Sequence, residues 1–170
     1  MIKDNIQEAI NNQINAELFS AYLYKSMSAY LQSENLTGMA AWMDLQAQEE
    51  MQHAMKFYDY LVERGGRVKL LSIDEPEYEW GSPLEIFEAS YKHEQYITER
   101  INNLVDLSMQ EKDHATGIML QWFVSEQVEE EAGVDEIVQK IKMISDSKHG
   151  MYMLDKELGG RQSESVEESE

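Results

Sequence analysis

The sequence predicts an all-α fold in which four long helices form a bundle, with one long crossover between the second and third helices and a short fifth helix. Three observations support this prediction. Four long segments repeat apolar and small residues at helical spacing, only two prolines occur in 170 residues, and two short connections flank one long connection. A chain of this length forms a single domain, expected over residues 1–160. Residues 161–170, mostly serine and glutamate, are expected to form a disordered acidic tail.

The first two predicted helices each place an acid inside the stripe that faces the core. Glu17 lies in the first stripe, and Glu50 lies in the second, with His53 one turn later. Gly65 and Gly66 follow the second helix and end it. The apolar and small members of the first stripe are Ile6, Ile10, Ile14, Ala21, Tyr24, Ser28 and Leu31, and those of the second are Met39, Met43, Ala47, Ala54, Phe57 and Leu61.

The third and fourth predicted helices are interrupted in the same way. The run Ser82-Pro83-Leu84-Glu85 opens the third helix as a capping box with proline at the first helical position, and the fourth helix begins near Asp113. Glu94 lies in the third stripe, and Gln127 and Glu130 lie in the fourth. The other members are Phe87, Ser90, Ile97, Ile101, Leu104 and Ser108 in the third stripe, and Met119, Phe123, Val134, Ile137, Ile141 and Ile144 in the fourth.

The lengths of the connections predict how the helices are arranged. Residues 33–36 and 111–113 are short links, so each joins two antiparallel helices. Residues 67–81 form a connection of about 15 residues, which at roughly 3.3 Å per residue spans the length of a long helix. The second and third helices are therefore expected to lie parallel, which is the ferritin-like topology. A short amphipathic fifth helix is expected around Met151, Leu154 and Leu158, ended by Gly159 and Gly160.

One pattern of metal-ligand residues occurs twice along the chain at an offset of 77 residues. The corresponding pairs are Glu17 and Glu94, Glu50 and Gln127, His53 and Glu130, and the neighbouring Glu49 and Glu126. Residues three apart on a helix point the same way, so each i, i+3 pair grips one ion while the single glutamate faces it from a neighbouring helix. The repeat therefore predicts a dinuclear metal site inside the bundle.

Charge balance favours two divalent cations at this position. An ionised carboxylate is costly to bury without a compensating charge, and Glu17, Glu50, Glu94 and Glu130 supply four negative charges against four positive ones. His53 adds a neutral imidazole that suits iron, manganese or zinc better than calcium. Carboxylates also bridge metals roughly 3.5–4 Å apart, the separation used in two-metal chemistry.

The composition excludes several classes of function. The net charge of −19, from 33 acidic and 14 basic residues, disfavours nucleic acid and anionic lipid and concentrates cations around the protein. No cysteine is present, which excludes disulfides, thiolate zinc sites and iron–sulfur clusters. The first residues lack the apolar core of a signal peptide, and no apolar run reaches membrane-spanning length. A cytoplasmic location is therefore expected.

The acids beside the repeated pattern have two interpretations. Glu49, Glu126 and Glu129 either form an adjacent third metal position that shares Glu130, or belong to a solvated acidic face. Tyr24 lies two turns after the first acid, where it either hydrogen-bonds a ligand, donates an electron, or fills the core with a satisfied hydroxyl.

Four further residues are expected to have no role in metal chemistry. Met51 is a conceivable haem ligand across a dimer axis, but a methionine on a helix that faces other helices normally packs, so no haem is expected. No partner at ligand spacing accompanies the other histidines. Surface positions are therefore expected for His93, His114 and His149.

The chain resembles the non-haem bacterial and archaeal ferritins over nearly its whole length, from about residue 5 to residue 158. The motifs that carry the resemblance are Asn15-Ala16-Glu17-Leu18, Gln48-Glu49-Glu50-Met51-Gln52-His53-Ala54, Tyr91-Lys92-His93-Glu94 and Leu120-Gln121-Trp122-Phe123-Val124-Ser125-Glu126-Gln127-Val128-Glu129-Glu130-Glu131. This resemblance implies a ferroxidase that oxidises Fe(II) with dioxygen or hydrogen peroxide. It also implies storage of ferric mineral inside a homo-oligomeric cage of roughly two dozen subunits, with the short fifth helix resembling one that lines a cage axis.

The resemblance further implies a position for each matching side chain. The first iron is expected among Glu17, Glu50, His53 and Gln127. The second iron is expected among Glu50, Glu94 and Glu130. A third iron position is expected among Glu49, Glu126, Glu129 and Glu130, and Tyr24 is expected beside the centre.

One departure from related di-iron bundles makes the predicted site asymmetric. Bacterioferritins and most other di-iron bundles carry a second Glu-x-x-His where this chain has Gln127 and Glu130, which predicts loosely held iron suited to storage. Rubrerythrins resemble the bundle but need a cysteine-bound iron module that this chain lacks. Two rival functions stay open: a di-iron oxidase or peroxide scavenger that retains its metals and stores nothing, and a passive metal buffer or structural bundle.

Overall fold

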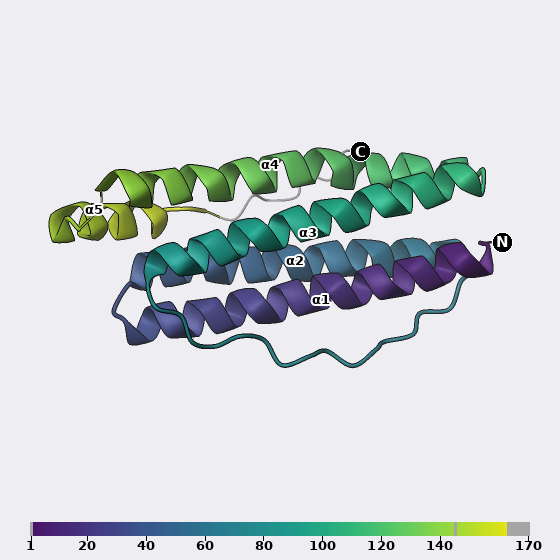
Figure 1. The fold of residues 1–170 in the computed structure, drawn as a ribbon. Helices are drawn as coiled ribbons and strands as arrows, with labels where there is room; N and C mark the ends of the chain where they lie inside the picture. Colours follow the sequence, from purple (N-terminus) through teal and green to yellow (C-terminus); the bar gives the residue numbers. More distant parts are fainter. Residues whose placement is uncertain (1, 145, 163–170) are drawn as a thin grey trace.

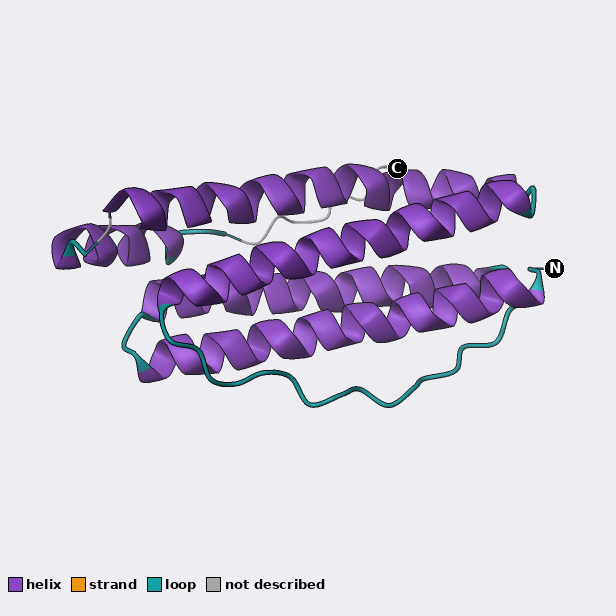
Figure 2. Ribbon diagram, in the orientation of Figure 1, coloured by secondary structure: helices purple, strands orange, loops and turns teal. Residues whose placement is uncertain are grey.

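The computed structural model describes residues 2–144 and 146–162, and within these ranges the chain forms five helices and no strand (Figures 1 and 2). This confirms the predicted all-α fold class. The predicted acidic tail from residue 163 to residue 170 lies outside the described residues. The helices are α1 (Asp4–Ser33), α2 (Thr37–Glu63), α3 (Pro83–Gln110), α4 (His114–Ile144) and α5 (Lys148–Leu158).

The four long helices pair as two antiparallel hairpins, α1 with α2 and α3 with α4, as the short links predict (Figure 1). Residues 64–82 run back along the outside of the α1–α2 hairpin and bring α3 parallel to α2. The two hairpin links share an uncommon backbone conformation, because Asn35 (φ 61°) and Lys112 (φ 55°) are both left-handed. These residues are also 77 positions apart. The internal repeat therefore extends from the candidate ligands to the backbone of the turns.

Helix α3 begins where the capping box predicts. The Ser82 side chain accepts a hydrogen bond from the Glu85 amide at 3.2 Å, and the Glu85 carboxylate in turn accepts one from the Gly81 amide at 2.7 Å. Pro83 occupies the first turn, where no backbone donor is needed. This fixed start places the rest of α3 in register with the candidate ligand on its inner face.

The core consists of two apolar clusters separated by a polar layer at mid-bundle. One cluster gathers around Leu31, Met43 and Phe87 toward the α5 end, and the other around Ile10, Phe57 and Phe123 at the opposite end; each draws on all four long helices. Nearly every predicted stripe position is buried. On α4, Leu120 is fully buried in place of the predicted Met119, which is only partly buried and packs at the edge of one cluster. Ile144 is also only partly buried and packs at the edge of the other cluster.

Helix α5 docks on the start of α2 through a close backbone approach. The Asp155 carboxylate accepts a hydrogen bond from the Met39 amide at 2.8 Å, and a Cβ on Gly38 would lie 1.7 Å from the Asp155 carbonyl oxygen. Only glycine fits at position 38 with α5 in this place. The end of α5, and the residues that follow it, are thereby held against the bundle.

Among the described residues, no helix combines the length and apolar content that crossing a lipid bilayer requires.

Candidate metal centre

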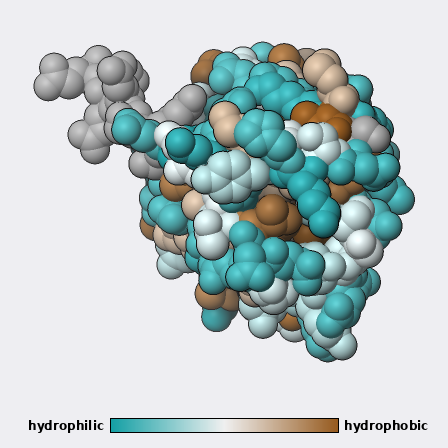
Figure 3. All heavy atoms as spheres, turned by 90° about the vertical axis from the view of Figure 1, so that its left-hand side faces the viewer, coloured by the Kyte–Doolittle hydropathy of each residue, from teal (hydrophilic) through white to brown (hydrophobic). Residues whose placement is uncertain are grey.

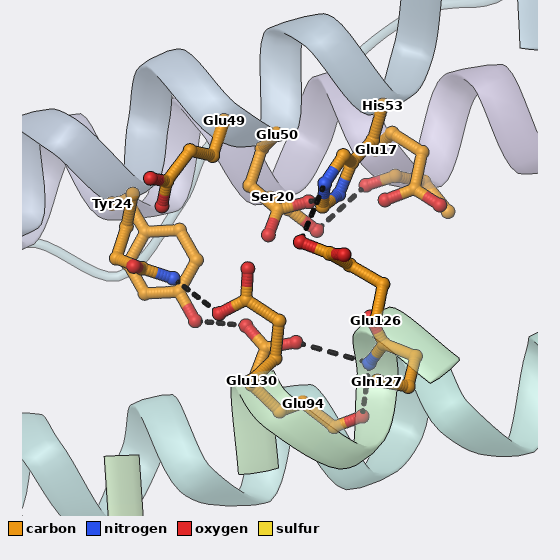
Figure 4. A network of polar contacts seen from close by, with 12 residues as sticks. Glu17, Ser20, Tyr24, Glu49, Glu50, His53, Glu94, Glu126, Gln127 and Glu130 are labelled. Carbon is orange, nitrogen blue, oxygen red and sulfur yellow. Dashed lines mark hydrogen bonds and ion pairs between the residues drawn. The ribbon is translucent and has the colours of Figure 1, made fainter. Parts of the chain in front are cut away.

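The candidate ligands of both halves converge in the polar layer, and both helices of each hairpin contribute to it (Figure 4). The contributing side chains are Glu17 from α1, Glu50 and His53 from α2, Glu94 from α3, and Gln127 and Glu130 from α4. All six are buried, and the first three glutamates are at most 1% exposed. The helical spacing therefore places these acids inward as expected, and the residues above and below them are apolar.

The first half of the repeat forms a compact group. Glu17, Glu50 and His53 each offer a ligand atom, and these atoms all lie within 4.8 Å of one another. Nδ1 of His53 is 3.5 Å from a carboxylate oxygen of Glu50. The imidazole ring is held from behind by edge-on contacts with Trp122 and Phe123, at ring-centre distances of 5.4 and 5.9 Å.

Three oxygens of this group are buried without any hydrogen-bond partner among the described residues. They are one oxygen of Glu17 and both oxygens of Glu50. A buried acceptor left without a donor costs free energy that a folded protein normally avoids. Converging carboxylate oxygens beside an imidazole nitrogen are a suitable donor set for a divalent transition metal, so these residues could hold such a cation.

Burial and mutual repulsion dominate the electrostatics of this cluster of carboxylates. Burial, together with the neighbouring carboxylates, raises the pKa of Glu50 well above its usual range. Burial also raises the pKa of Glu17, that of Glu94 to about 7 and that of Glu130 to about 8. Burial lowers the pKa of His53 to about 4, so its imidazole is neutral and available as a ligand at neutral pH.

The second half of the repeat is tied by hydrogen bonds within the protein. Glu94 accepts a short hydrogen bond from the Tyr24 hydroxyl and another from the Gln127 amide nitrogen at 3.2 Å. The Tyr24 hydroxyl itself accepts from Ser90 at 3.1 Å. Burial raises the pKa of Tyr24 well above 10, which keeps it a neutral donor. Of the interpretations left open by the sequence, the structure supports a hydrogen bond from Tyr24 to a candidate ligand.

Two glutamines that the sequence analysis missed hold candidate ligands. The Gln13 amide nitrogen donates to Glu17 at 2.7 Å, and the Gln46 amide nitrogen donates to Glu130 at 2.7 Å. Each glutamine precedes an inward glutamate of its own helix by four residues, so a search at i−4 from each acid finds both. Behind them, Arg100 donates to the Gln13 side-chain oxygen at 3.0 Å and Arg161 donates to that of Gln46.

The four acids assigned to a third position lie in different surroundings. Glu126 and Glu130 form a second group with His53, their ligand atoms all within 4.8 Å of one another. Glu49 forms an ion pair with Arg161 at 2.8 Å. Glu129 is exposed and belongs to neither group of potential ligands in the described ranges.

Arg161 departs from the expectation of a disordered tail from residue 161, because its guanidinium contacts α2.

His93 does not occupy the surface position expected for it. Its ring is mostly buried between α1 and α3, with Nε2 2.7 Å from the Ser20 hydroxyl and the ring against Phe19 and Tyr24. Burial lowers its pKa to about 4. A sequence search for ligand spacing cannot find this histidine, because its partners lie on another helix. By contrast, His114 and His149 are exposed.

Comparisons with known proteins identify the family of the chain. The family model described as ferritin, ferritin-like domain, matches residues 7–144. The chain belongs to the ferritin family. A bacterial non-heme ferritin from Bacteroides fragilis is 47% identical over 161 residues, which are 95% of this chain and 100% of that protein. A bacterial non-heme ferritin from Escherichia coli is 40% identical over 158 residues, 93% of this chain and 96% of the relative.

The ferritin fold is equally clear in three dimensions. A solved open-pore ferritin from the hyperthermophilic archaeon Archaeoglobus fulgidus superimposes with a TM-score of 0.94 at 53% sequence identity, covering 95% of this chain and 100% of that one. The resemblance inferred from the motifs is thereby confirmed, as is the ferritin-like bundle. Family membership supports the expectation of an iron-storage protein in its general form.

Proposed function

We propose that this chain is an iron-storage ferroxidase, which oxidises Fe(II) with dioxygen or hydrogen peroxide at a dinuclear centre and stores the ferric product as a mineral inside an oligomeric cage. The observation that carries the proposal is the set of buried oxygens of Glu17 and Glu50 that have no hydrogen-bond partner among the described residues, beside the neutral imidazole of His53. Such atoms fit a cation that enters, reacts and leaves.

The side chains divide into two iron positions that share Glu50. In the proposal, Glu17, Glu50, His53 and Gln127 surround the first iron, and Glu50, Glu94 and Glu130 surround the second. The Gln127 amide nitrogen donates a hydrogen bond to the Glu94 carboxylate at 3.2 Å. The amide oxygen of Gln127 is therefore the atom that could bind a metal. Tyr24 orients the Glu94 carboxylate rather than binding metal itself.

The proposed reaction balances at this site. Two Fe(II) ions each give up one electron, and dioxygen with two protons becomes hydrogen peroxide. The two Fe(III) ions then carry two more positive charges than the four carboxylates Glu17, Glu50, Glu94 and Glu130 neutralise. Hydroxide or oxide must supply that charge, which favours hydrolysis and departure of the ferric product.

Two exposed apolar surfaces support assembly into a homo-oligomer. Leu18, Tyr22 and Met51 line an apolar groove between α1 and α2, closed by Ile73 of the crossover; here Met51 is 46% exposed rather than packed within its own chain. A second apolar hollow lies on the end of the molecule near α5 (Figure 3). Surfaces of this kind usually mark interfaces. A cage of about 24 copies with closed symmetry is the proposed assembly.

Aerobic loading with Fe(II) tests the storage function against its main rival. The iron-free protein should take up iron far beyond three ions per chain and elute as a large assembly in size-exclusion chromatography. Uptake that stops at two or three ions per chain favours a di-iron oxidase or peroxide scavenger that stores nothing.

We further propose the cytoplasm as the location of this protein, which fractionation of the source cells would test.

Two substitutions test the third alternative, a passive metal buffer or structural bundle. His53→Ala and Glu130→Ala should both slow Fe(II) oxidation sharply, because each removes a ligand that no neighbour replaces. His114→Ala is the matched control, since His114 is exposed at the start of α4. Oxidation at the parent rate in both ligand variants would favour the passive alternative.

A further inference from the structure

The segment that follows α5 places an arginine on the candidate metal centre. Arg161 donates to both carboxylate oxygens of Glu49, at 3.1 and 2.8 Å. Its guanidinium lies over the Trp42 ring at 4.9 Å from the ring centre. The two charged side chains are only 27% and 16% exposed. A paired, stacked and largely buried arginine is a specific contact rather than a loose surface ion pair.

The same guanidinium reaches a second candidate ligand through an amide. Arg161 donates to the side-chain oxygen of Gln46, and the amide nitrogen of Gln46 donates to Glu130 at 2.7 Å. Gln46 is fully buried, so these two contacts decide which end of its amide faces the centre. Arg161 therefore holds Glu49 directly and orients the donor to Glu130.

The fold fixes Arg161 in this place. Backbone hydrogen bonds continue through the end of α5, from Gly159 to Asp155 at 3.0 Å and from Arg161 to Leu158 at 3.2 Å. Asp155 also anchors α5 to the start of α2 through the Met39 amide. The contact of Arg161 with Glu49 thus follows from the docking of α5 and joins residues 112 positions apart.

A second arginine provides an internal comparison. Arg100 contacts Gln13 in the same way, at 3.0 Å, and Gln13 donates to Glu17. Its other donors reach neutral groups, the Asn12 carbonyl at 3.0 Å and the Tyr96 hydroxyl at 3.1 Å. Arg161 differs because it directly covers an acid of the proposed third iron position.

We propose that Arg161 is a positioning residue that acts as a displaceable cation at Glu49, holding this carboxylate until a metal ion takes its place. The inference rests on the proposed function and adds to its two iron positions the third one that the sequence resemblance leads us to expect, with Glu49 as a ligand. A metal ion bound to Glu49 at about 2 Å would use the same two carboxylate oxygens that accept hydrogen bonds from Arg161. The metal ion and the guanidinium are both positively charged, so they repel each other at that separation. Metal binding there releases Arg161 from Glu49, Gln46 and Trp42 together.

Two consequences follow for iron. The third position binds more weakly than the pair, because an ion must displace a bound cation to reach it. Iron also binds at the third position only when its concentration is high enough to compete with Arg161. Glu49 therefore binds iron after the two paired positions are occupied. The ligands of the pair in the first half, Glu17, Glu50 and His53, have no contact of this kind with Arg161.

The test is an anaerobic titration of the assembled, iron-free, full-length protein with Co(II), followed by calorimetry and tryptophan fluorescence. In Arg161→Gln the third equivalent per chain should bind about tenfold more tightly, the size of effect expected for loss of a charge-assisted hydrogen-bonded pair. The equivalent bound by Glu17, Glu50 and His53, which Arg161 does not contact, should be unchanged. Arg161→Lys, which keeps the charge without the paired donors, should fall between parent and Arg161→Gln.

Fluorescence provides a readout that a purely structural role would not move. In the parent protein, binding of the third equivalent should change the fluorescence emission of Trp42, because the Arg161 cation over the Trp42 ring departs. The emission of Trp42 is identified as the part that the Trp42→Phe substitution abolishes. That change should be missing in Arg161→Gln, where no cation has to leave. Lys156→Gln is the matched control: it removes one positive charge from exposed α5 surface and should titrate like the parent.

The outcomes separate this inference from the proposed function. If the first two equivalents fail to bind in the parent, the dinuclear centre itself is wrong. If they bind and the third equivalent has the same or lower affinity in Arg161→Gln, or is missing from both proteins, the displaceable cation is overturned. A third equivalent that appears only in Arg161→Gln supports it. If Arg161→Gln fails to assemble, the same criteria apply to Arg161→Lys.

Discussion

The two halves of the candidate centre have the same helical framework and opposite hydrogen bonding. In the first half, both oxygens of Glu50 and one of Glu17 lack any donor within the described part of the chain. In the second half, Glu94 and Glu130 accept hydrogen bonds from Tyr24, Gln127 and Gln46. On the proposed function, a cation would supply the missing partners in the first half, whereas in the second half a cation would have to replace hydrogen bonds that already satisfy the carboxylates.

This difference shows how one helical framework, repeated in two halves, can carry two unlike proposed metal positions. The turns at Asn35 and Lys112 keep the same backbone conformation 77 residues apart. The side chains differ between the halves at two repeated positions. Gln127 corresponds to Glu50, and Glu130 corresponds to His53. We expect tight binding in the first half and looser binding in the second, which suits an ion that has to move on.

The largest expected effect comes from removing the residue that both positions share. Glu50→Ala should lower the initial rate of Fe(II) oxidation by about 100-fold or more, because it removes a bridging ligand and one of the four negative charges that balance the two ions. Stopped-flow absorbance of the ferric product measures the rate. Glu63→Ala, at an exposed position near the end of the same helix, is the control. A rate within a factor of two of the parent would mean that Glu50 bridges no iron.

A second substitution makes the two halves more alike. Gln127→Glu restores the repeat of Glu50 and adds a buried carboxylate at the proposed first iron position, so the metal there should be retained more tightly while the metal-free fold loses about 2 kcal/mol of unfolding free energy. Calorimetric titration with Co(II) and denaturant unfolding measure the two effects. Gln121→Glu, exposed on α4, should change neither. Weaker metal binding in Gln127→Glu would contradict the comparison between the halves.

The pH dependence of the metal-free protein follows from the raised carboxyl pKa values. Burial raises the pKa of Glu94 from 4.5 to about 7 and that of Glu130 from 4.5 to about 8. The folded state then binds protons that the unfolded state releases, so these two acids lower the unfolding free energy between about pH 4.5 and pH 8. Burial lowers the pKa values of His53 and His93 from 6.5 to about 4, which acts in the opposite direction below about pH 6.5. The net fall in unfolding free energy should therefore appear between about pH 6.5 and pH 8.

Bound Zn(II) should shift this dependence in the opposite direction, because the ion competes with the protons for the same oxygens. Denaturant unfolding at a fixed protein concentration across the pH range measures both curves. A metal-free protein whose stability rises from pH 6.5 to pH 8 would contradict the burial of these acids.

The smallest expected effect is at Tyr24. Tyr24→Phe removes the hydrogen bond to Glu94 and leaves the ring in place, so oxidation should slow by a few-fold and the unfolding free energy should fall by about 1 kcal/mol. Tyr78→Phe serves as the control, because Tyr78 is 63% exposed. A loss of activity as large as that of Glu50→Ala would mean that Tyr24 takes part in electron transfer rather than in orienting a ligand.

Local sequence signals predicted the helices and the inward acids well. The capping box at Ser82, the two short links and the i, i+3 pairs depend on neighbours along one helix, so the sequence carries them directly. Met119 was assigned to the core in place of Leu120, because both positions lie one turn before Phe123 and only packing decides between them.

The rest of the site depends on contacts between distant segments, which spacing does not encode. His93 is mostly buried because Ser20 and Phe19 lie opposite it on another helix. Arg161 reaches Glu49 only because α5 folds back onto α2. Composition alone assigned that arginine to a disordered tail, since nothing nearby in the sequence shows what it contacts.

Anomalous diffraction from iron-soaked crystals tests the dinuclear centre most directly. Two peaks roughly 3.5–4 Å apart should lie among Glu17, Glu50, His53, Glu94 and Glu130, with the peak beside His53 the stronger at low iron. An absence of anomalous density between these side chains, in crystals that hold iron elsewhere, would contradict the proposed centre.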